Sequence, residues 1–246
     1  MRLTSDIEVE FKKDTHQYFR HGQEYISQSK FVKIFEPQFD PAIVHFSAKK
    51  EGISSEAMQA QWDKKRDDAG EYGTEIHDVI EGSWYGKTVP VKYEQMIEDI
   101  RTLVQPSKIQ YPEKILYLDH AKIAGTADLP SERTVVKGRQ LIDIFDYKTN
   151  KAKGVTLYAS KIKDGKWSHY GESRFLGPIS HLEYTLYNKY ALQVSLYMYM
   201  VQFNYDTIPG RLGIIYINPA LGVSIIPVPY MKMEVESMIN YYLEMK

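Results

Sequence analysis

The stretch Leu141-Ile142-Asp143-Ile144-Phe145-Asp146-Tyr147-Lys148 decides the fold that we expect, and Gly125-Thr126-Ala127-Asp128 precedes it. The residues before Asp146 are apolar enough for a buried central strand, so its carboxylate should emerge where the sheet meets solvent. Side chains alternate along a strand, and Asp146 and Lys148 should therefore share one face. Tyr147 should point the other way, but its backbone carbonyl remains available as a ligand. A tight turn at Gly125 can present Asp128 at a sheet edge.

Two helical segments carry polar residues that could complete a site with this strand. Upstream, Gly73, His77 and Glu81 share one helix face at intervals of four residues. Downstream, Gln193 and Tyr197 share a face in the same way. Each fragment alone more often has a structural explanation, such as a hydrogen-bonded histidine or a strand end in solvent. Their occurrence together, in this order, indicates a functional site.

Two carboxylates and a lysine on neighbouring strands are suited to metal-dependent hydrolysis of phosphodiester bonds. One or two Mg²⁺ or Mn²⁺ ions can activate a water, neutralise the nonbridging oxygens and stabilise the leaving oxygen. Mg²⁺ prefers oxygen ligands, whereas an imidazole suits Mn²⁺ better. We therefore expect a site for these ions with ligands from Asp128, Asp146, the Tyr147 carbonyl and His77. Lys148 should stand beside the metal, where it can orient or deprotonate the attacking water.

The composition limits the classes of protein that fit. The 246 residues can bury a core as a single domain, and the net charge of -1 argues against a large sequence-independent affinity for DNA backbone. A nucleic-acid site must therefore be a local basic groove or use bound metal for part of its positive charge. Cysteine is absent, which excludes disulfides, cysteine-ligated zinc and iron–sulfur clusters. With no apolar run of about 18 residues and no secretory signal, we expect a cytoplasmic protein without membrane contact.

The periodicity of apolar residues predicts an α/β or α+β domain with a mixed central sheet flanked by helices. An N-terminal hairpin should lead into a short helix capped by Ser27 or Ser29. Further helices are expected at residues 54–69, 71–83, 91–104, 182–203 and 231–245, and strands at 109–118, 122–129, 140–147, 212–218 and 223–228. Residues 1–70 should pack on a core of residues 71–246, with a Lys-, Gly- and Ser-rich insertion at about 149–180.

Four segments match, in order, those of a known family. They are Gly73-Thr74-Glu75-Ile76-His77, Gly125-Thr126-Ala127-Asp128, Asp146-Tyr147-Lys148-Thr149 and Gln193-Val194-Ser195-Leu196-Tyr197. Together they resemble the PD-(D/E)XK nuclease superfamily, specifically its RecB-like branch. The resemblance implies a restriction-endonuclease-like core in which His77, Asp128 and Asp146 bind metal and Lys148 is the catalytic lysine. It further implies that Gln193 and Tyr197 support the lysine and the DNA, and that Glu113 adds an acidic group near the metals.

The N-terminal hairpin and helices, with residues 62–66 leading into Gly73, look similar to mitochondrial genome maintenance exonucleases and their phage-type relatives. That similarity implies a DNA exonuclease acting at single-stranded or frayed ends, in DNA repair or recombination. Candidate DNA contacts are Arg66, Tyr197 and two lysines of the insertion, Lys151 and Lys153. Related branches hold an iron–sulfur cluster through cysteines, so this chain does not belong with them.

Three alternatives to a single-strand exonuclease remain open. The same chemistry would serve a structure-specific endonuclease, or an exonuclease that digests double-strand ends like that of phage lambda and forms a ring-shaped oligomer. A nuclease fold used only to bind nucleic acid or a partner protein is an alternative of another class. Such degenerate proteins usually lose a metal ligand or the lysine, whereas Asp128, Asp146 and Lys148 are all present.

Overall fold

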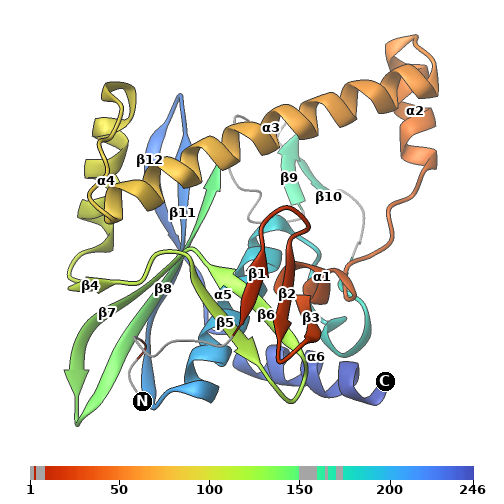
Figure 1. Ribbon diagram of the computed structural model, residues 1–246. Helices are drawn as coiled ribbons and strands as arrows, with labels where there is room; N and C mark the ends of the chain where they lie inside the picture. Colours follow the sequence, from red (N-terminus) through yellow and green to blue (C-terminus); the bar gives the residue numbers. More distant parts are fainter. Residues whose placement is uncertain (1–2, 4–8, 150–159, 164–165, 170–173) are drawn as a thin grey trace.

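The computed structural model describes residue 3 and residues 9–149, 160–163, 166–169 and 174–246. Its central sheet has the strand order β12-β11-β8-β7-β4 (Figure 1). β8 runs parallel to β11 and antiparallel to β7, so this sheet is mixed. The strand bounds are Gly222–Pro227 for β12, Thr207–Asn218 for β11, Arg139–Thr149 for β8, Leu129–Val136 for β7 and Ile109–Gln110 for β4.

A second mixed sheet has the order β1-β2-β3-β6-β5, with β3 parallel to β6. Its strands are Glu10–Lys12 (β1), Gln17–Arg20 (β2), Gln23–Ser27 (β3), Ile123–Ala127 (β6) and Lys114–Leu118 (β5). β9 (Ser160–Lys163) and β10 (Lys166–His169) pair as a separate hairpin. The two larger sheets meet where β6 passes into β7, because Asp128 is the single residue between those strands.

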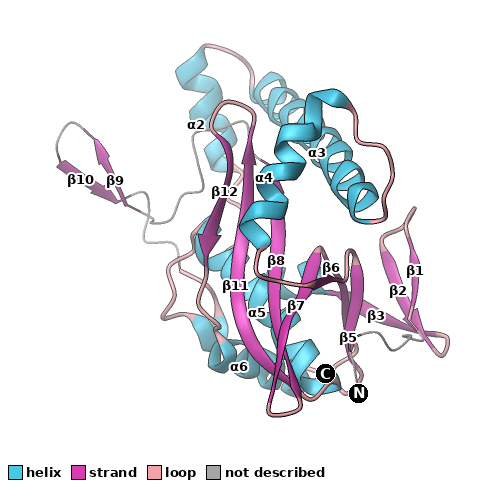
Figure 2. Cartoon of the chain, turned by 90° about the vertical axis from the view of Figure 1, so that its left-hand side faces the viewer, coloured by secondary structure: helices cyan, strands magenta, loops and turns pink. Residues whose placement is uncertain are grey.

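Helices cover both faces of the central sheet (Figure 2). From β8, Ile142 and Ile144 pack into a core with α5 (Leu186–Asn204), α6 (Lys232–Glu244) and α1 (Gln28–Lys33). Phe145 and Tyr147 face the opposite core, formed with α3 (Ser55–Trp84) and α4 (Glu94–Val104). Two 3₁₀ turns and one helix complete the elements: η1 (Val91–Tyr93), η2 (Gly177–Ile179) and α2 (Ala42–Glu51). This arrangement confirms the expected α+β class with a mixed sheet flanked by helices.

The prediction of two separate helices at residues 54–69 and 71–83 was wrong, because α3 is one helix of 30 residues. Gly70 and Gly73 lie within it, and two glycines weaken a helix without ending it, whereas a proline would break it. The expected division at residues 70 and 71 therefore falls inside α3.

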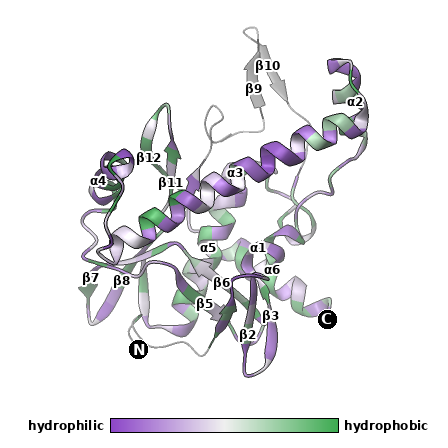
Figure 3. Ribbon diagram, turned by 45° about the horizontal axis from the view of Figure 1, so that its top comes forward, coloured by the Kyte–Doolittle hydropathy of each residue, from purple (hydrophilic) through white to green (hydrophobic). Residues whose placement is uncertain are grey.

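Helix α3 is hydrophilic over much of its length (Figure 3). No helix among the described residues is long and apolar enough to cross a membrane.

The predicted strand at 109–118 is two strands in different sheets. β4 pairs with β7, β5 pairs with β6, and Pro112 lies in the break between them. β7 itself was not expected, since Pro130 and the charged residues that follow lack a strand pattern. Pro130 is tolerated because its backbone nitrogen faces away from β8, on the side where its carbonyl accepts from the Tyr111 N–H, so the ladder to β8 loses no hydrogen bond. In the insertion, residues 150–159 lie outside the described part, and Lys151 and Lys153 are among them.

A buried carboxylate, that of Asp143, ties three strands of the central sheet together. Its fully buried oxygens accept hydrogen bonds from Arg133 Nε on β7 (3.2 Å), from the backbone N of Arg211 on β11 (2.6 Å) and from Ser107 Oγ (2.9 Å). Burial alone would raise the pKa of Asp143, but these donors outweigh it and hold the pKa below its ordinary value. Arg211 Nη2 also donates to the carbonyl of Val104 at the end of α4 (2.7 Å).

We expect Asp143→Asn to lower the free energy of unfolding by about 3 kcal/mol, because two partly buried guanidinium groups lose their counter-charge. Urea unfolding followed by circular dichroism measures this. The matched control is Asp63→Asn, which breaks an exposed pair with Arg66 and should cost less than about 1 kcal/mol. Equal losses in the two variants would show that the buried network does not stabilise the sheet.

Candidate metal centre

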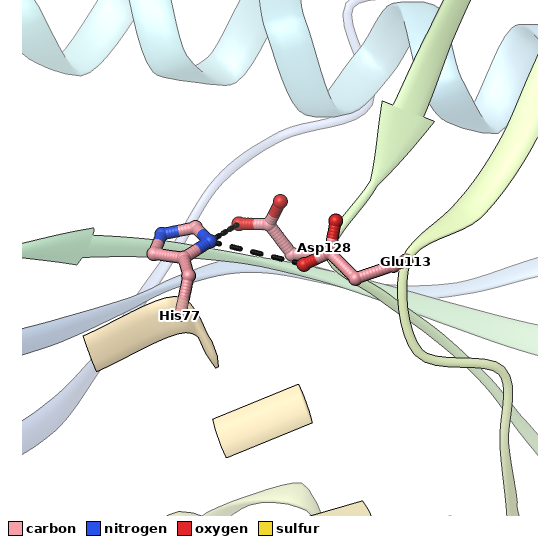
Figure 4. A group of neighbouring side chains, drawn as sticks. All are labelled: His77, Glu113 and Asp128. Carbon is pink, nitrogen blue, oxygen red and sulfur yellow. Dashed lines mark ion pairs between the residues drawn. The ribbon is translucent and has the colours of Figure 1, made fainter. Parts of the chain in front are cut away.

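Three side chains from distant parts of the chain converge at the junction of the two sheets (Figure 4). His77 comes from α3, Glu113 from the segment between β4 and β5, and Asp128 from between β6 and β7. One ligand atom from each lies within 4.8 Å of the others. The Nδ1 atom of His77 is 3.8 Å from Oε1 of Glu113 and 3.9 Å from Oδ2 of Asp128. A nitrogen and two carboxylates at this spacing can hold a divalent cation.

Backbone groups hold the two carboxylate residues in place. Asp128 Oδ2 accepts a hydrogen bond from the backbone N–H of Tyr147 at 2.7 Å. This bond lies just beyond Leu129 and Phe145, the last pair in the ladder between β7 and β8. The backbone N–H of Glu113 donates to the carbonyl of Asp128 at 3.0 Å, and Glu113 has a φ of 49°. Since positive φ is uncommon outside glycine, this turn indicates that the position of Glu113 is imposed by its surroundings.

Asp146 and Lys148 form an ion pair, as their shared face on β8 predicts. Asp146 is buried, and the Lys148 ammonium also lies 5.0 Å from the centre of the Tyr190 ring. Burial opposes the charge of Lys148, but Asp146 and Asp128 outweigh it and raise the pKa of Lys148 to about 12. The lysine is therefore a cation at neutral pH. Tyr147 points to the other face, where its hydroxyl accepts a hydrogen bond from Trp84 Nε1 (3.1 Å).

The crowding of acids shifts the pKa values of the other two groups. Burial and then the charge of Asp146 raise the pKa of Asp128 to about 7. For His77, burial would lower the pKa, but Asp128 and Glu113 outweigh it and raise the pKa to about 9. In the metal-free protein the protonated imidazole of His77 is therefore the positive charge between the carboxylates of Glu113 and Asp128.

Two glycines allow the elements of the centre to approach closely. A Cβ on Gly73 would lie 3.2 Å from Thr149 Oγ1, so this glycine lets α3 pass near the end of β8. A Cβ on Gly125 would lie 2.7 Å from the Cβ of Gln28 and 3.0 Å from the Tyr197 ring. The tight turn expected at Gly125 was wrong, because Gly125 lies within β6 and pairs with Leu116; it serves instead the close packing of β6 against α1 and α5.

The centre opens into a cleft of about 690 Å³. His77, Glu113 and Asp128 line it together with Asp146 and Lys148. Gln193 and Tyr197 line it as well, so α5 brings both to the site. Other lining residues come from the β1–β2 hairpin, α1, α3 and β6; they include Phe11, Lys13, His16, Tyr18, Gln28, Gly70, Asp78, Glu81 and Thr126.

The two residues from α5 play different parts. The hydroxyl of Tyr197 donates to the carbonyl of Thr126 at 2.7 Å, and so braces the strand that leads to Asp128. Gln193 Oε1 is buried and has no hydrogen-bond partner among the described residues. Arg66, the other candidate for DNA contact on described residues, is exposed, forms ion pairs with Asp63 and Asp67, and is not among the residues that line the cleft.

Sequence patterns missed Gln28, Tyr18 and Thr126, which all line the cleft. The side chain of Gln28 is buried, and its Nε2 has no hydrogen-bond partner among the described residues. The only local signal was Ser27, which caps α1 as expected and so places Gln28 at the first helical position. Nothing local connects these residues, because the pairing of β3 with β6 brings them together.

Comparisons with known proteins add little to this geometry. No protein-family model matches the chain, and no curated protein matches it. The crystal structure of SSO0001 aligns with a TM-score of 0.35 and 10% identity, over 90% of this chain and 76% of that one. A protein from Eubacterium rectale named "Putative exonuclease" aligns with a TM-score of 0.36 and 14% identity, over 90% of this chain and 79% of that one. At these scores neither likeness carries an argument about function.

The raised pKa values predict that the metal-free protein loses stability as pH rises. A raised pKa means that the folded protein binds more protons than the unfolded chain, and deprotonation then costs stability. Asp128 contributes this loss between about pH 3.8 and 7, and His77 between about pH 6.5 and 9. Urea unfolding in EDTA should therefore give a lower free energy at pH 9 than at pH 6.5, and Mg²⁺ should offset the loss.

The control for this experiment is a pair of histidine variants. His77→Gln should flatten the pH dependence between pH 6.5 and 9, whereas His45→Gln, on α2, should leave it unchanged. The same slope in wild-type and His77→Gln protein would contradict the assignment of His77 as the cation between the two carboxylates.

Proposed function

We propose that this protein is a metal-dependent nuclease that hydrolyses phosphodiester bonds of DNA. The observation that carries the proposal is the convergence of His77, Glu113 and Asp128 within 4.8 Å in a cleft that also contains the Asp146–Lys148 pair. Metal ligands beside a lysine in one cleft are the groups that this reaction requires.

The donor set fits a divalent ion. His77, Glu113 and Asp128 would supply a nitrogen and two carboxylates, and the buried carboxylate of Asp146, whose Oδ2 pairs with Lys148, would add an oxygen. The backbone N–H of Tyr147 donates to Asp128. Because a strand residue directs its N–H and C=O to the same edge of the strand, the carbonyl of Tyr147 also faces the Asp128 side. Oxygen ligands favour Mg²⁺, and the imidazole favours Mn²⁺. Either ion would neutralise the nonbridging oxygens and stabilise the leaving oxygen.

Lys148 acts in this proposal as a charged donor. In the metal-free protein Asp146 and Asp128 raise its pKa to about 12, and as a cation Lys148 can orient the attacking water and bind the scissile phosphate. Asp146 holds the ammonium in place through the ion pair. Gln193 lines the same cleft with a free amide oxygen and would contact substrate or the water network, while Tyr197 braces the carbonyl of Thr126.

We further propose that the enzyme is an exonuclease acting at single-stranded or frayed DNA ends. The similarity of the N-terminal hairpin and helices to mitochondrial genome maintenance exonucleases supports this, and His77, Asp128, Lys148 and Gln193, one from each of the four matching segments, line one cleft.

We expect Lys148→Ala to reduce Mn²⁺-supported degradation of a labelled single-stranded oligonucleotide by about 10²- to 10⁴-fold, because the phosphate and water lose their charged donor. Asp146→Asn should have a comparable effect. Initial rates measure both, with circular dichroism to verify folding. The matched control is Lys92→Ala, which removes an exposed lysine paired with Glu75 outside the cleft and should leave the rate unchanged. Wild-type rates in a folded Lys148→Ala protein would contradict the assignment.

A closed circular single strand separates exonuclease from endonuclease activity. We expect the enzyme with Mn²⁺ to leave the circle intact while it degrades a linear strand of the same sequence, because an exonuclease requires a free end. Gel electrophoresis of both substrates over time gives the result. Linearisation of the circle would instead support the endonuclease, and degradation of blunt duplex alone would support an exonuclease of the lambda type.

A further inference from the structure

One wall of the cleft is aromatic and comes from the β1–β2 hairpin. The rings of Phe11 and Tyr18 stack with centres 4.7 Å apart and planes 23° apart. The ring of His16 stands edge-on to both, with centres 5.2 Å from Phe11 and 5.9 Å from Tyr18. All three residues line the same cleft as the metal centre, and His16 is exposed. An exposed ring supported by two others forms a rigid surface for stacking.

This wall is tied to the metal centre. The hydroxyl of Tyr18 and Oγ1 of Thr126 are 3.0 Å apart, and Thr126 lies two residues before Asp128. The hydroxyl of Tyr197 also donates a hydrogen bond to the carbonyl of Thr126. The aromatic wall therefore keeps a constant position relative to Asp128, as a substrate site next to a reacting phosphate requires.

The backbone of His16 is in the left-handed region, with a φ of 51°. A non-glycine residue there is strained, and such strain is concentrated at functional sites. His21, in the β2–β3 turn, has nearly the same φ of 49° but does not line the cleft. The chain thus contains two histidines of similar backbone conformation, only one of which faces the cleft.

α3 lines the same cleft with the small residues Gly70, Gly73 and Thr74, followed by His77, Asp78 and Glu81. A Cβ on Gly70 would have no atom within 4 Å, which leaves open space beside Thr74. Lys13 Nζ, at the hairpin turn, lies 3.7 Å from Asp78 Oδ1 on α3, so hairpin and helix meet over the cleft. The aromatic wall thus lines one cleft together with Gly70 and Gly73 of α3, which carry no side chains.

The charge of the cleft limits what can lie against this wall. Outside the metal ligands, Glu81 and the Lys13-paired Asp78 line it, and these acids would repel the phosphates of a nucleic acid. An uncharged, flat group meets no such repulsion, and stacking of a base on an aromatic side chain is favourable for every base. The base of a nucleotide next to the scissile phosphate is such a group.

We propose that Phe11, His16 and Tyr18 form a stacking site for one unpaired nucleobase adjacent to the scissile phosphodiester. This proposal rests on the proposed nuclease function. Because a base inside a duplex already has both faces covered by its neighbours, the site accepts a nucleotide only where the strand is unpaired or frayed. Selection for single strands then comes from the hairpin, and it tolerates any base because every base has a flat aromatic face.

The test is the variant His16→Asn, which removes the ring, while asparagine tolerates the same backbone conformation. We expect KM for a single-stranded oligothymidylate to rise about tenfold, with kcat changed much less. The matched control His21→Asn makes the same substitution at the same φ outside the cleft and should leave both constants unchanged. Phe11→Leu, which keeps apolar volume but removes the supporting ring, should raise KM by a smaller factor.

A second arm uses oligothymidylates with one abasic nucleotide moved along the strand from the cleaved end. At one position the abasic nucleotide should raise KM of the wild-type enzyme about as much as His16→Asn raises it on the intact strand. The same abasic strand should raise KM of the His16→Asn protein no further. Equal KM values for wild-type and His16→Asn proteins, or equal effects of the two asparagine variants, would overturn the stacking site and leave the nuclease function standing. If wild-type protein degrades no DNA, the nuclease function fails. Fluorescence anisotropy with intact and abasic strands then decides whether His16 contacts a base.

Discussion

The hydrogen bond from the backbone N–H of Tyr147 to the carboxylate of Asp128 is the contact on which the candidate site depends. Asp128 stands alone between β6 of one sheet and β7 of the other. Its carboxylate occupies the place beside β8 where the ladder to β7 ends, and so joins the two sheets at their junction. A single side chain therefore both connects the sheets and directs one oxygen toward His77.

Electrostatics imposes the second constraint. Asp128, Glu113 and Asp146 are crowded together with only His77 and Lys148 as cations, so the described centre carries an excess of negative charge. Buried charges require partners, and the raised pKa values of His77 and Asp128 are the response of the metal-free protein. A divalent ion would satisfy the same carboxylates without a proton on the imidazole.

The parts of the fold and of the candidate site that depend on local sequence patterns could be predicted. The apolar run before Asp146 and the alternation of Asp146, Tyr147 and Lys148 along β8 follow from the period of a strand, and the cap at Ser27 follows from helix chemistry. The predictions were wrong where tertiary contacts override local preference. Helix α3 continues through Gly70 and Gly73, because Ile76 and Ile80 of the same helix are buried in the core that contains Phe145. Of these two glycines, only Gly73 lies close to a neighbouring strand. β7 forms despite Pro130, because β8 pairs with it and the proline nitrogen faces away from β8.

The sequence by itself determined which side chains could do chemistry and which of them share a strand or helix face, since both depend on residue type and on the period of the backbone. Only the tertiary structure decided that Glu113 joins His77 and Asp128, that Tyr197 braces Thr126, and that an aromatic hairpin and α3 line one cleft. These contacts join residues tens of positions apart through the pairing of β3 with β6 and the meeting of two sheets at Asp128. The order of residues along the chain contains no local signal for such pairings, because their stability comes from the packing of the whole domain.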